Sequence, residues 1–454
     1  MRRLLVGFTV VLFCTSSLHS GCFEGGATFN AKAPGNNDSG GIDLSGQGDP
    51  NKGGSDGRKD VAVDPHGVYM LASLGQTLVM GELVSGKMHS MPDVGAPSRV
   101  AFATKANRFY VTSAAGDPRW VYGVDSKTRK VIWKRGLSGF TGMVGLYPSM
   151  DDAFLVLADQ HRLEIVDAAD GTFTTTYAPE HQIADLDITP DSKKVVVTEE
   201  HTISGGEERT AIFLLNPDGE EVKKISVPNC SSPLVLSKDG ARAFLAPTQC
   251  GQDPVSAIDL VKGEFIKNLP GFGPVAMAPD GTAAVAFMDT VAMDKTLFED
   301  KSQIPSTSKR YHMMVIDPAT LKFSSIALGD NLPRYAISRD GKVVLVDSVW
   351  MGLKEQVRLV DLKSGAVRPV SAEVYLDHFV LSPNNTDVYL LSEDLLRHLD
   401  LKKAEVRPVS LGSVRCQSLN ITLTGDTLLI MDWQDQVHLL NTRTEKVSRT
   451  LSLK

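Results

Sequence analysis

The chain has 454 residues, a formal net charge of −7 and a hydrophobic fraction of 42%, which is typical of a folded, soluble body with a sizeable core. No basic stripe interleaved with aromatic residues occurs, so nucleic acid is not an expected partner. Apart from one run at the N-terminus, no long apolar stretch is present, which excludes a conventional membrane-spanning helix in the body of the chain.

Residues 1–21 have the parts of a secretory signal, namely two arginines, an apolar run over 4–13 and small residues before Cys22. The apolar run is too short to span a bilayer. The end of this segment resembles the bacterial lipobox, in which a small residue precedes a cysteine that receives lipid, although His19 stands where that pattern has an aliphatic residue. The resemblance implies lipidation of Cys22, and ordinary signal cleavage that leaves a free thiol is the alternative.

Residues 22–57 are rich in Gly, Asn, Asp and Ser and contain few core-forming side chains, which predicts a flexible tether. Several acyl chains on Cys22 would anchor this tether stably in a membrane. Phe23, rather than an acidic residue, follows the cysteine. In the lipoproteins that this N-terminus resembles, such a residue implies release to the outer membrane. We therefore expect an anchored protein of the cell envelope that faces the periplasm or the exterior.

From residue 58 to 454 the chain repeats an apolar stretch, a tight polar turn and a second apolar stretch. Nine such units begin at Val61, Val100, Val144, Leu186, Leu234, Val275, Tyr335, Phe379 and Asn420. Their spacing is mostly about 40 to 48 residues, with one step of about 60, and this is the period of four-stranded propeller blades. In the seventh unit, the turn 339–341 joins two strand-forming runs, and a second hairpin follows over 357–371.

A lone four-stranded sheet cannot bury both faces, so neighbouring units must stack and their inner strands should be apolar. The sequence therefore predicts an all-β fold, with a single β-propeller of four-stranded antiparallel blades over 58–454. Nine units exceed the usual number of blades, so rings of eight or seven blades stay open, and the terminal segment 447–454 could close the ring against the first unit. The repeats resemble bacterial YVTN-type and WD40-like propellers, a fold that serves enzymes, assembly factors and docking modules alike.

The cysteines of the propeller suggest one crosslink. Cys230 and Cys250 lie symmetrically about the turn 238–240, which places both at the open end of one hairpin. In an oxidising periplasm we expect a disulfide between them, and two reduced thiols are the alternative. Cys416 has no obvious mate and is expected to be a small buried hydrophobe. No CxxC spacing occurs, and neither a metal nor a cofactor is expected.

Aromatic residues mark one face of the expected ring. In a propeller, the loops between second and third strands emerge on the same side as the links between blades. Trp120, Trp350 and Trp433 fall in such loops, and the longest insertions, from Glu199 and Asp289, join them there. Long loops with aromatic side chains are where a rigid ring usually carries its recognition surface. The alternative is that each tryptophan packs against the next blade.

Charged residues are expected at one level just before the inner strands, near the mouth of the central channel. These residues are Asp60, Arg99, Asp185, Arg334 and His378. Arg99, Arg334 and His378 could hold an anion or a peptide terminus, and simple solvation at the mouth is the alternative. Asp187 lies deeper and is expected to be a hydrogen-bonded structural carboxylate, with a catalytic or metal role as the other reading.

The usual hydrolase, phosphate and calcium motifs are missing from the sequence. This disfavours an enzyme without excluding one, because propeller enzymes assemble their sites from scattered residues. The favoured function is a lipid-anchored binding or scaffold module that engages a protein, a peptide or an envelope polymer through the tryptophan-rich face. The alternative is a periplasmic enzyme, lactonase-like or a sugar-directed hydrolase, with Asp185, Asp187 or His378 near the channel.

Overall fold

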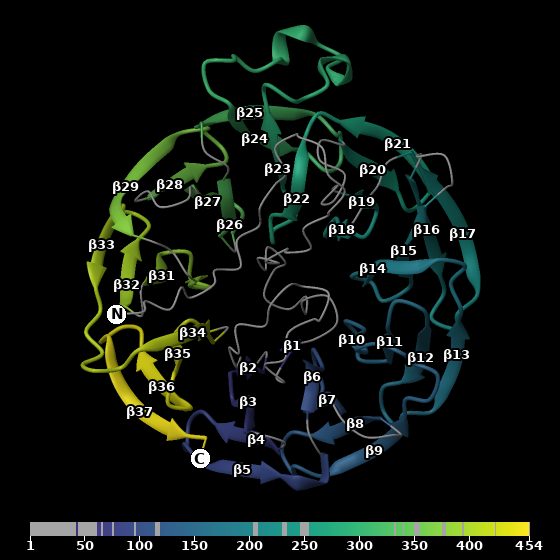
Figure 1. Cartoon of the computed structure of the whole chain (residues 1–454), viewed down its shortest axis with the longest axis vertical. Coiled ribbons are helices and arrows are strands. Elements are labelled where there is room, and N and C mark those ends of the chain that lie inside the picture. The colour runs from purple at the N-terminus through teal and green to yellow at the C-terminus, as the bar shows by residue number, and fades with distance from the viewer. Residues whose placement is uncertain are drawn as a thin grey trace, which may run out of the picture.

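The computed structural model is a ring of nine antiparallel sheets, seen end-on in Figure 1. It describes residues 42–43, 61–64, 67–74, 77–94, 97–113, 119–202, 208–228, 234–245, 254–330, 333–338, 340–348, 355–374, 378–392, 395–422 and 424–453. Within these residues the regular secondary structure is strand, apart from three short 3-10 helices. The prediction of an all-β propeller is confirmed, and the ring uses all nine repeat units as blades.

Each blade consists of four strands that follow one another in the sequence. Blade 1 has β2 (Val61–Val63), β3 (Tyr69–Leu74), β4 (Thr77–Glu82) and β5 (Met88–Met91), blade 2 has β6 (Pro97–Phe102), β7 (Arg108–Ser113), β8 (Trp120–Asp125) and β9 (Val131–Gly136), and blade 3 has β10 (Gly145–Pro148), β11 (Phe154–Ala158), β12 (Leu163–Asp167) and β13 (Phe173–Tyr177). The helix η1 (Pro92–Val94) links blades 1 and 2.

The middle of the chain forms the next three blades. Blade 4 has β14 (Gln182–Ile188), β15 (Val195–Thr202), β16 (Glu208–Leu215) and β17 (Glu221–Val227), blade 5 has β18 (Leu234–Leu236), β19 (Arg242–Leu245), β20 (Val255–Asp259) and β21 (Glu264–Leu269), and blade 6 has β22 (Phe272–Met277), β23 (Ala284–Asp289), β24 (Tyr311–Ile316) and β25 (Phe323–Gly329). Between β23 and β24 lie η2 (Lys295–Leu297) and η3 (Lys301–Gln303).

The last three blades complete the ring. Blade 7 has β26 (Pro333–Ile337), β27 (Val343–Ser348), β28 (Glu355–Asp361) and β29 (Val367–Val374), blade 8 has β30 (His378–Leu381), β31 (Asp387–Ser392), β32 (Leu395–Asp400) and β33 (Glu405–Pro408), and blade 9 has β34 (Cys416–Ile421), β35 (Thr427–Asp432), β36 (Gln436–Asn441) and β37 (Lys446–Ser452).

The polar turn that recurs in the sequence is a hydrogen-bonded hairpin turn between the first two strands. In blade 5 the Ser237 hydroxyl donates to the Asp239 carboxylate at 2.6 Å and accepts the backbone N–H of Arg242 at 2.8 Å. Gly240 has φ of 68°, a conformation that glycine adopts without steric cost. The same pair of hydroxyl bonds recurs in blade 7, so the repeated sequence sets the same turn in different blades.

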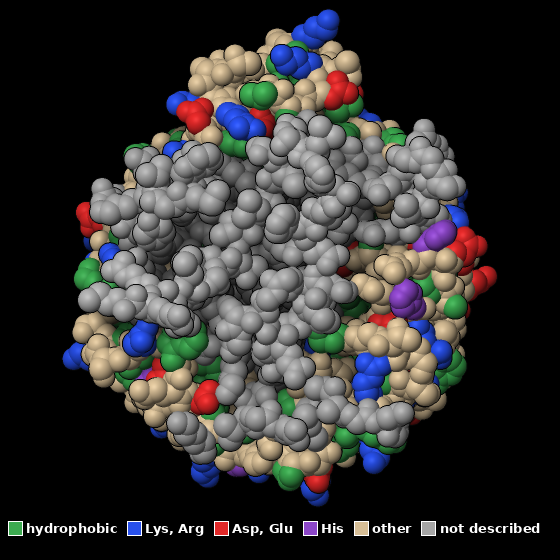
Figure 2. Space-filling model, in the orientation of Figure 1, with side chains coloured by type: hydrophobic (Ala, Val, Ile, Leu, Met, Phe, Trp, Pro, Cys, Tyr) green, Lys and Arg blue, Asp and Glu red, His purple; other side chains and the backbone are tan. Residues whose placement is uncertain are grey.

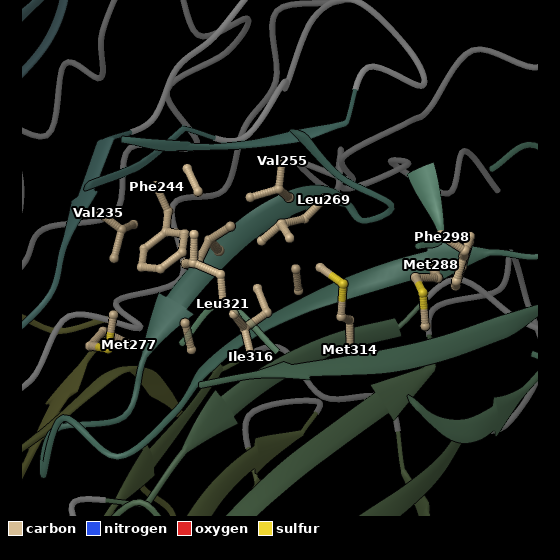
Figure 3. Close-up of a cluster of buried hydrophobic side chains, with 14 residues drawn as sticks. Val235, Phe244, Val255, Leu269, Met277, Met288, Phe298, Met314, Ile316 and Leu321 are labelled. Carbon is tan, nitrogen blue, oxygen red and sulfur yellow. The ribbon is translucent and has the colours of Figure 1, made fainter. Parts of the chain in front are cut away.

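The hydrophobic core lies between blades rather than within one. One cluster takes Val235 and Phe244 from blade 5 and Met288 and Met314 from blade 6, and Figure 3 shows these side chains between the two sheets. Because each blade contributes one face to each of its neighbours, a blade could not bury its apolar side chains alone. Small residues stand in the inner strands where the blades converge, as expected, and Ala62 is fully buried there.

The ring closes without sharing a strand between its first and last blades. The terminal strand β37 pairs with β36 inside blade 9, and blade 1 is likewise made of consecutive strands. The seam between them is an apolar cluster that includes Met70 of blade 1 and Leu439 and Leu451 of blade 9. Across it, Arg449 Nη1 donates to the carbonyl oxygen of Val84 at 3.1 Å. Among the described residues, closure therefore depends on side-chain packing and includes this hydrogen bond from an exposed arginine.

Two regions differ from the predicted scheme. The insertion that begins at Glu199 leaves a shorter loop than expected, because β15 and β16 are eight residues each and pair as far as Thr202 and Glu208. The signal segment, Cys22 and most of the expected tether lie outside the described residues. Within the tether range, β1 (Ile42–Asp43) pairs antiparallel with the inner strand β6. No described helix has the length and apolar character needed to cross a membrane.

Candidate binding face

The second-to-third strand connection of every blade leaves the ring at the same end as the link to the next blade, because successive strands alternate in direction. We call this end the connection face. It includes the turns 159–162 in blade 3 and 433–435 in blade 9, and the long segment 290–310 in blade 6. The geometry therefore gathers loops from all nine blades on one side of a rigid scaffold.

Trp433 stands in the turn between β35 and β36 with 50% of its surface exposed. The turn is fixed from below by Asp432, whose Oδ1 accepts the backbone N–H of Gln434 at 2.8 Å and of Gln436 at 2.9 Å. A carboxylate that accepts two backbone amides holds the turn in one conformation. The aromatic side chain is thus presented from a preorganised loop, which lowers the entropic cost of binding.

The Asp432 carboxylate is itself held by a buried histidine. Its Oδ2 lies 2.9 Å from Nε2 of His438, and Nδ1 of His438 lies 3.0 Å from the hydroxyl of Thr450. Burial opposes ionisation of Asp432, but the hydrogen bonds from His438 and the two backbone amides outweigh it and lower the pKa of the carboxyl group. The residues from three strands therefore act as one support beneath Trp433.

Exposed apolar side chains occur at this type of turn in three blades. Among the described large apolar residues, those exposed in or beside a second-to-third strand connection are Val291 in blade 6 (79% exposed), Leu395 in blade 8 (57%) and Trp433 in blade 9. Trp350, the predicted member from blade 7, lies outside the described residues. Of these, Leu395 and Trp433 come from adjacent blades, and exposed apolar side chains that gather on one face can mark an interaction site.

Trp120 sits differently from Trp433. It begins β8 and is half-buried against the apolar cluster between blades 1 and 2. Its backbone N–H donates to the Ser113 hydroxyl at 2.9 Å, and Lys134 Nζ lies 4.8 Å from the ring centroid. The indole therefore packs toward the neighbouring blade and has a cation over its ring, and its role in binding stays a prediction. Trp133 lies in the fourth strand β9 and is buried.

Arg99, Arg334 and His378 lie inside the inner strands β6, β26 and β30 rather than just before them. Each pairs with the penultimate residue of the second strand of its blade, so the three positions share one level near the connection face. The backbone N–H of Arg99 donates to the Thr112 hydroxyl at 3.1 Å. The side chains of Arg334 and His378 are outside the described part of the structure, and an anion site there stays a prediction.

Two carboxylates near the channel are bound to the backbone. Asp185 is buried, and its two oxygens accept the N–H of Leu186 and the N–H of Leu234, each at 2.8 Å. Because Leu234 belongs to blade 5, Asp185 ties blade 4 to the next blade. Asp187 accepts the N–H of Ile188 at 2.9 Å. Asp60, the remaining acidic residue of the predicted mouth, lies outside the described residues.

The segment 290–310 projects beyond the outer strands of blade 6, as the upper part of Figure 1 shows. Lys and Arg side chains stand beside Asp and Glu side chains on this projection (Figure 2). Asp294 and Asp300 cap η2 and η3, and their side chains accept the N–H groups of Thr296 and Ser302. The long spacing between the sixth and seventh units therefore supplies an ordered arm rather than an extra blade.

Sequence reasoning missed a buried ionic cluster between blades 2 and 3. Glu164 is nearly inaccessible, and its carboxylate lies 3.1 Å from Nη2 of Arg135 and 2.7 Å from Nη2 of Arg162. Both guanidinium groups also lie over aromatic rings, Arg135 over Phe173 and Arg162 over Phe140. Arg162 stands two residues before Glu164, but Arg135 reaches the carboxylate from β9 of the neighbouring blade, and no linear motif links it to the other two.

The metal and cysteine predictions can be compared with the part of the chain that is described. Those residues contain no group of His, Cys, Asp and Glu side chains arranged to hold a metal ion. Cys416 is buried, as expected of a small core residue. Cys230 and Cys250 lie outside the described residues, so the disulfide between them stays a prediction.

Comparison with known proteins identifies the fold but no family. No family model and no curated protein matches this chain, so the resemblance to YVTN-type propellers stays a prediction. Among solved structures, dihydro-heme d1 dehydrogenase NirN is similar with a TM-score of 0.54 at 12% identity, over 86% of this chain and 74% of NirN. A eukaryotic initiation factor is similar with a TM-score of 0.53 at 11% identity, over 73% of this chain and 82% of that one. At such identities the likeness concerns the propeller fold alone.

Proposed function

We propose that this protein is a lipid-anchored propeller of the cell envelope that binds a protein or peptide through its connection face. The observation that carries the proposal is the turn of Trp433, where a half-exposed indole is held on a loop fixed by a buried carboxylate. Tryptophans of this kind are enriched among the residues that dominate binding energy. Val291 and Leu395 extend the same type of apolar exposure to two other blades.

The predicted anchor completes the proposal. A lipid on Cys22 would hold the ring at a membrane through the segment 22–57, and outer-membrane release follows from the resemblance of the N-terminus to bacterial lipoproteins. Replacing Cys22 by Ser should move the protein from the membrane fraction to the soluble fraction after cell lysis. Intact-mass measurement of the membrane form should show the added acyl chains. A wild-type protein of unmodified mass would contradict the anchor while leaving the binding face untested by that result.

Binding is tested by crosslinking and affinity capture from native envelope with the wild-type chain, followed by purification of the component that is recovered. Trp433→Ala and Leu395→Ala should each weaken direct binding of that purified component by at least about tenfold, the scale of a moderate hot spot. The matched control is Val261→Ala, because Val261 is 79% exposed in a third-to-fourth strand turn on the opposite end of the ring. Equal affinity of the two test variants and the wild type would refute this face as the contact.

A further inference from the structure

The arm 290–310 is docked on the ring by an apolar contact. Phe298 is buried, and its ring meets that of Phe323 in β25 edge to face with centroids 5.7 Å apart. Phe298 belongs to the cluster between blades 5 and 6, and Figure 3 shows it beside Met288 at one end of that cluster. Met293 and Ile304 pack against the same cluster. The arm therefore forms a lid over one end of the core.

His312 lies beneath this lid. It is the second residue of β24, directly opposite Met288 on β23 and Ala327 on β25. Since alternate residues of a strand share a face, its side chain is on the same side as Met314, which belongs to the cluster that Phe298 closes. Only 5% of His312 is exposed. An imidazole thus occupies a position whose neighbours on the sheet are apolar.

The ring of His312 is poorly satisfied by hydrogen bonds. Within the described structure, neither Nδ1 nor Nε2 forms a hydrogen bond of normal geometry, and the backbone groups that interact with the ring belong to Ser306 and Lys309 of the arm. Burial disfavours the charged form and lowers the pKa of His312, although the backbone carbonyls of Ser306 and Lys309 in the arm act in the opposite direction. Buried polar atoms without partners are rare and call for an explanation, because a leucine or methionine would fill this position at lower cost.

Three ion pairs among the described residues tie the arm to the ring. Arg310 is 2.9 Å from Asp289 of β23, Lys309 is 3.2 Å from Asp330 after β25, and Glu299 is 2.8 Å from Lys267 of β21. Hydrogen bonds to Lys267 and to the backbone of Arg310 lower the pKa of Glu299 and Asp330. These carboxylates therefore stay ionised where a histidine titrates, and His312 is the only histidine between His201 and His378.

We propose that the arm 290–310 is an acid-released lid, and that protonation of His312 beneath it favours the undocked state. The direction of the pH dependence follows from the linkage between docking and proton binding. Docking buries the imidazole and favours its neutral form, so the docked arm binds a proton more weakly than the undocked arm does. The stability of docking is therefore complete above the ordinary pKa of histidine, near 6.5, and is lost as the pH falls from that value toward the lower pKa of the docked state. Release would expose Phe298 and Phe323, which creates an apolar surface at the rim of the ring only in acid.

Amide hydrogen exchange of the full-length protein at pH 7.5 and pH 5.5, corrected for the intrinsic pH dependence of exchange, tests this directly. In the wild type, the opening equilibrium of the arm, measured on peptides that cover 290–310, should be at least about threefold larger at pH 5.5 than at pH 7.5. The opening equilibrium measured on peptides from β9 should be the same at both pH values. His312→Leu and His312→Gln should each abolish the pH dependence, because neither residue titrates. His161→Gln, which replaces an exposed histidine of blade 3, should keep it.

His312→Leu and His312→Gln control for each other. The leucine removes the buried polar group, and the glutamine keeps a polar group that does not titrate. A wild-type arm that exchanges equally at both pH values would overturn the proposal. So would an acid-dependent opening that persists unchanged in a folded His312→Leu or His312→Gln protein, since another group would then be responsible.

Discussion

Asp432 supports the turn that carries Trp433 without being part of the proposed binding surface. Replacing it should therefore test the support of this turn separately from the binding contact. Asp432→Ala removes the acceptor of two backbone amides and the partner of His438, which lie 2.8 to 2.9 Å from the carboxylate. Hydrogen bonds to a charged group contribute about 1.5 to 3 kcal/mol each, but the turn amides can regain water, so we expect a loss of about 3 kcal/mol. In a domain of this size that lowers Tm by about 4 °C. Asp432→Asn keeps an oxygen for the amides and should lose about half as much.

Calorimetry measures the stability, and iodide quenching of fluorescence measures the exposure of Trp433. Asp170→Asn is the matched control, because Asp170 accepts the Thr172 N–H in an exposed turn and should change stability by less than about 0.5 kcal/mol. Since the pKa of Asp432 is lowered in the folded state, its contribution is complete above about pH 4 and is lost as the pH falls through the folded pKa. The difference in the free energy of unfolding between the wild type and Asp432→Asn should therefore become smaller as the pH falls. If Asp432→Ala had the same Tm as Asp170→Asn, this reasoning would be refuted.

Three further substitutions probe the ring itself. Glu164→Gln should lower the free energy of unfolding by about 2 to 3 kcal/mol, because two partly exposed guanidinium groups lose a buried counter-charge; an unchanged denaturation midpoint would contradict this. Gly123→Ala places a Cβ 2.3 Å from the Trp133 ring and should alter the near-ultraviolet circular dichroism, whereas Gly412→Ala, which has nothing within 4 Å, should cost only about 1 kcal/mol of backbone strain. Leu439→Ala should cost about 2 to 5 kcal/mol at the seam, and proteolysis that does not begin in blade 1 or blade 9 would argue against a weakened closure.

The architecture was accessible from the sequence because its determinants are local. A hydroxyl, an aspartate and a glycine recur at fixed offsets, and in blade 5 Ser237, Asp239 and Gly240 form the turn that those offsets predict. Each local turn fixes a hairpin, and apolar strands on both sides of it require a neighbour. The number of blades was left open between nine, eight and seven, and the structure uses all nine units. The long sixth step is accounted for by the arm 290–310.

The candidate site was less accessible because its determinants are contacts between distant residues. Whether a tryptophan packs or projects depends on the neighbouring blade, so Trp120 and Trp433 looked alike in sequence and differ in exposure. Glu164 meets Arg135 from another blade, and no spacing rule connects them. The setting of His312 depends on an arm that folds back over it, which periodicity alone does not reveal.

The way the ring is closed decides how it would respond to mechanical load. Within each blade, strands are joined along ladders of backbone hydrogen bonds, but blades 1 and 9 meet through apolar side chains and the Arg449 contact. Tension applied to the chain before β1 first loads the pairing of β1 with β6 of blade 2, and only then β2, which lies beside this junction. Once β1 has separated from β6, we expect the ring to open between blades 1 and 9 before any blade unfolds, because the described strands of these two blades share no backbone ladder.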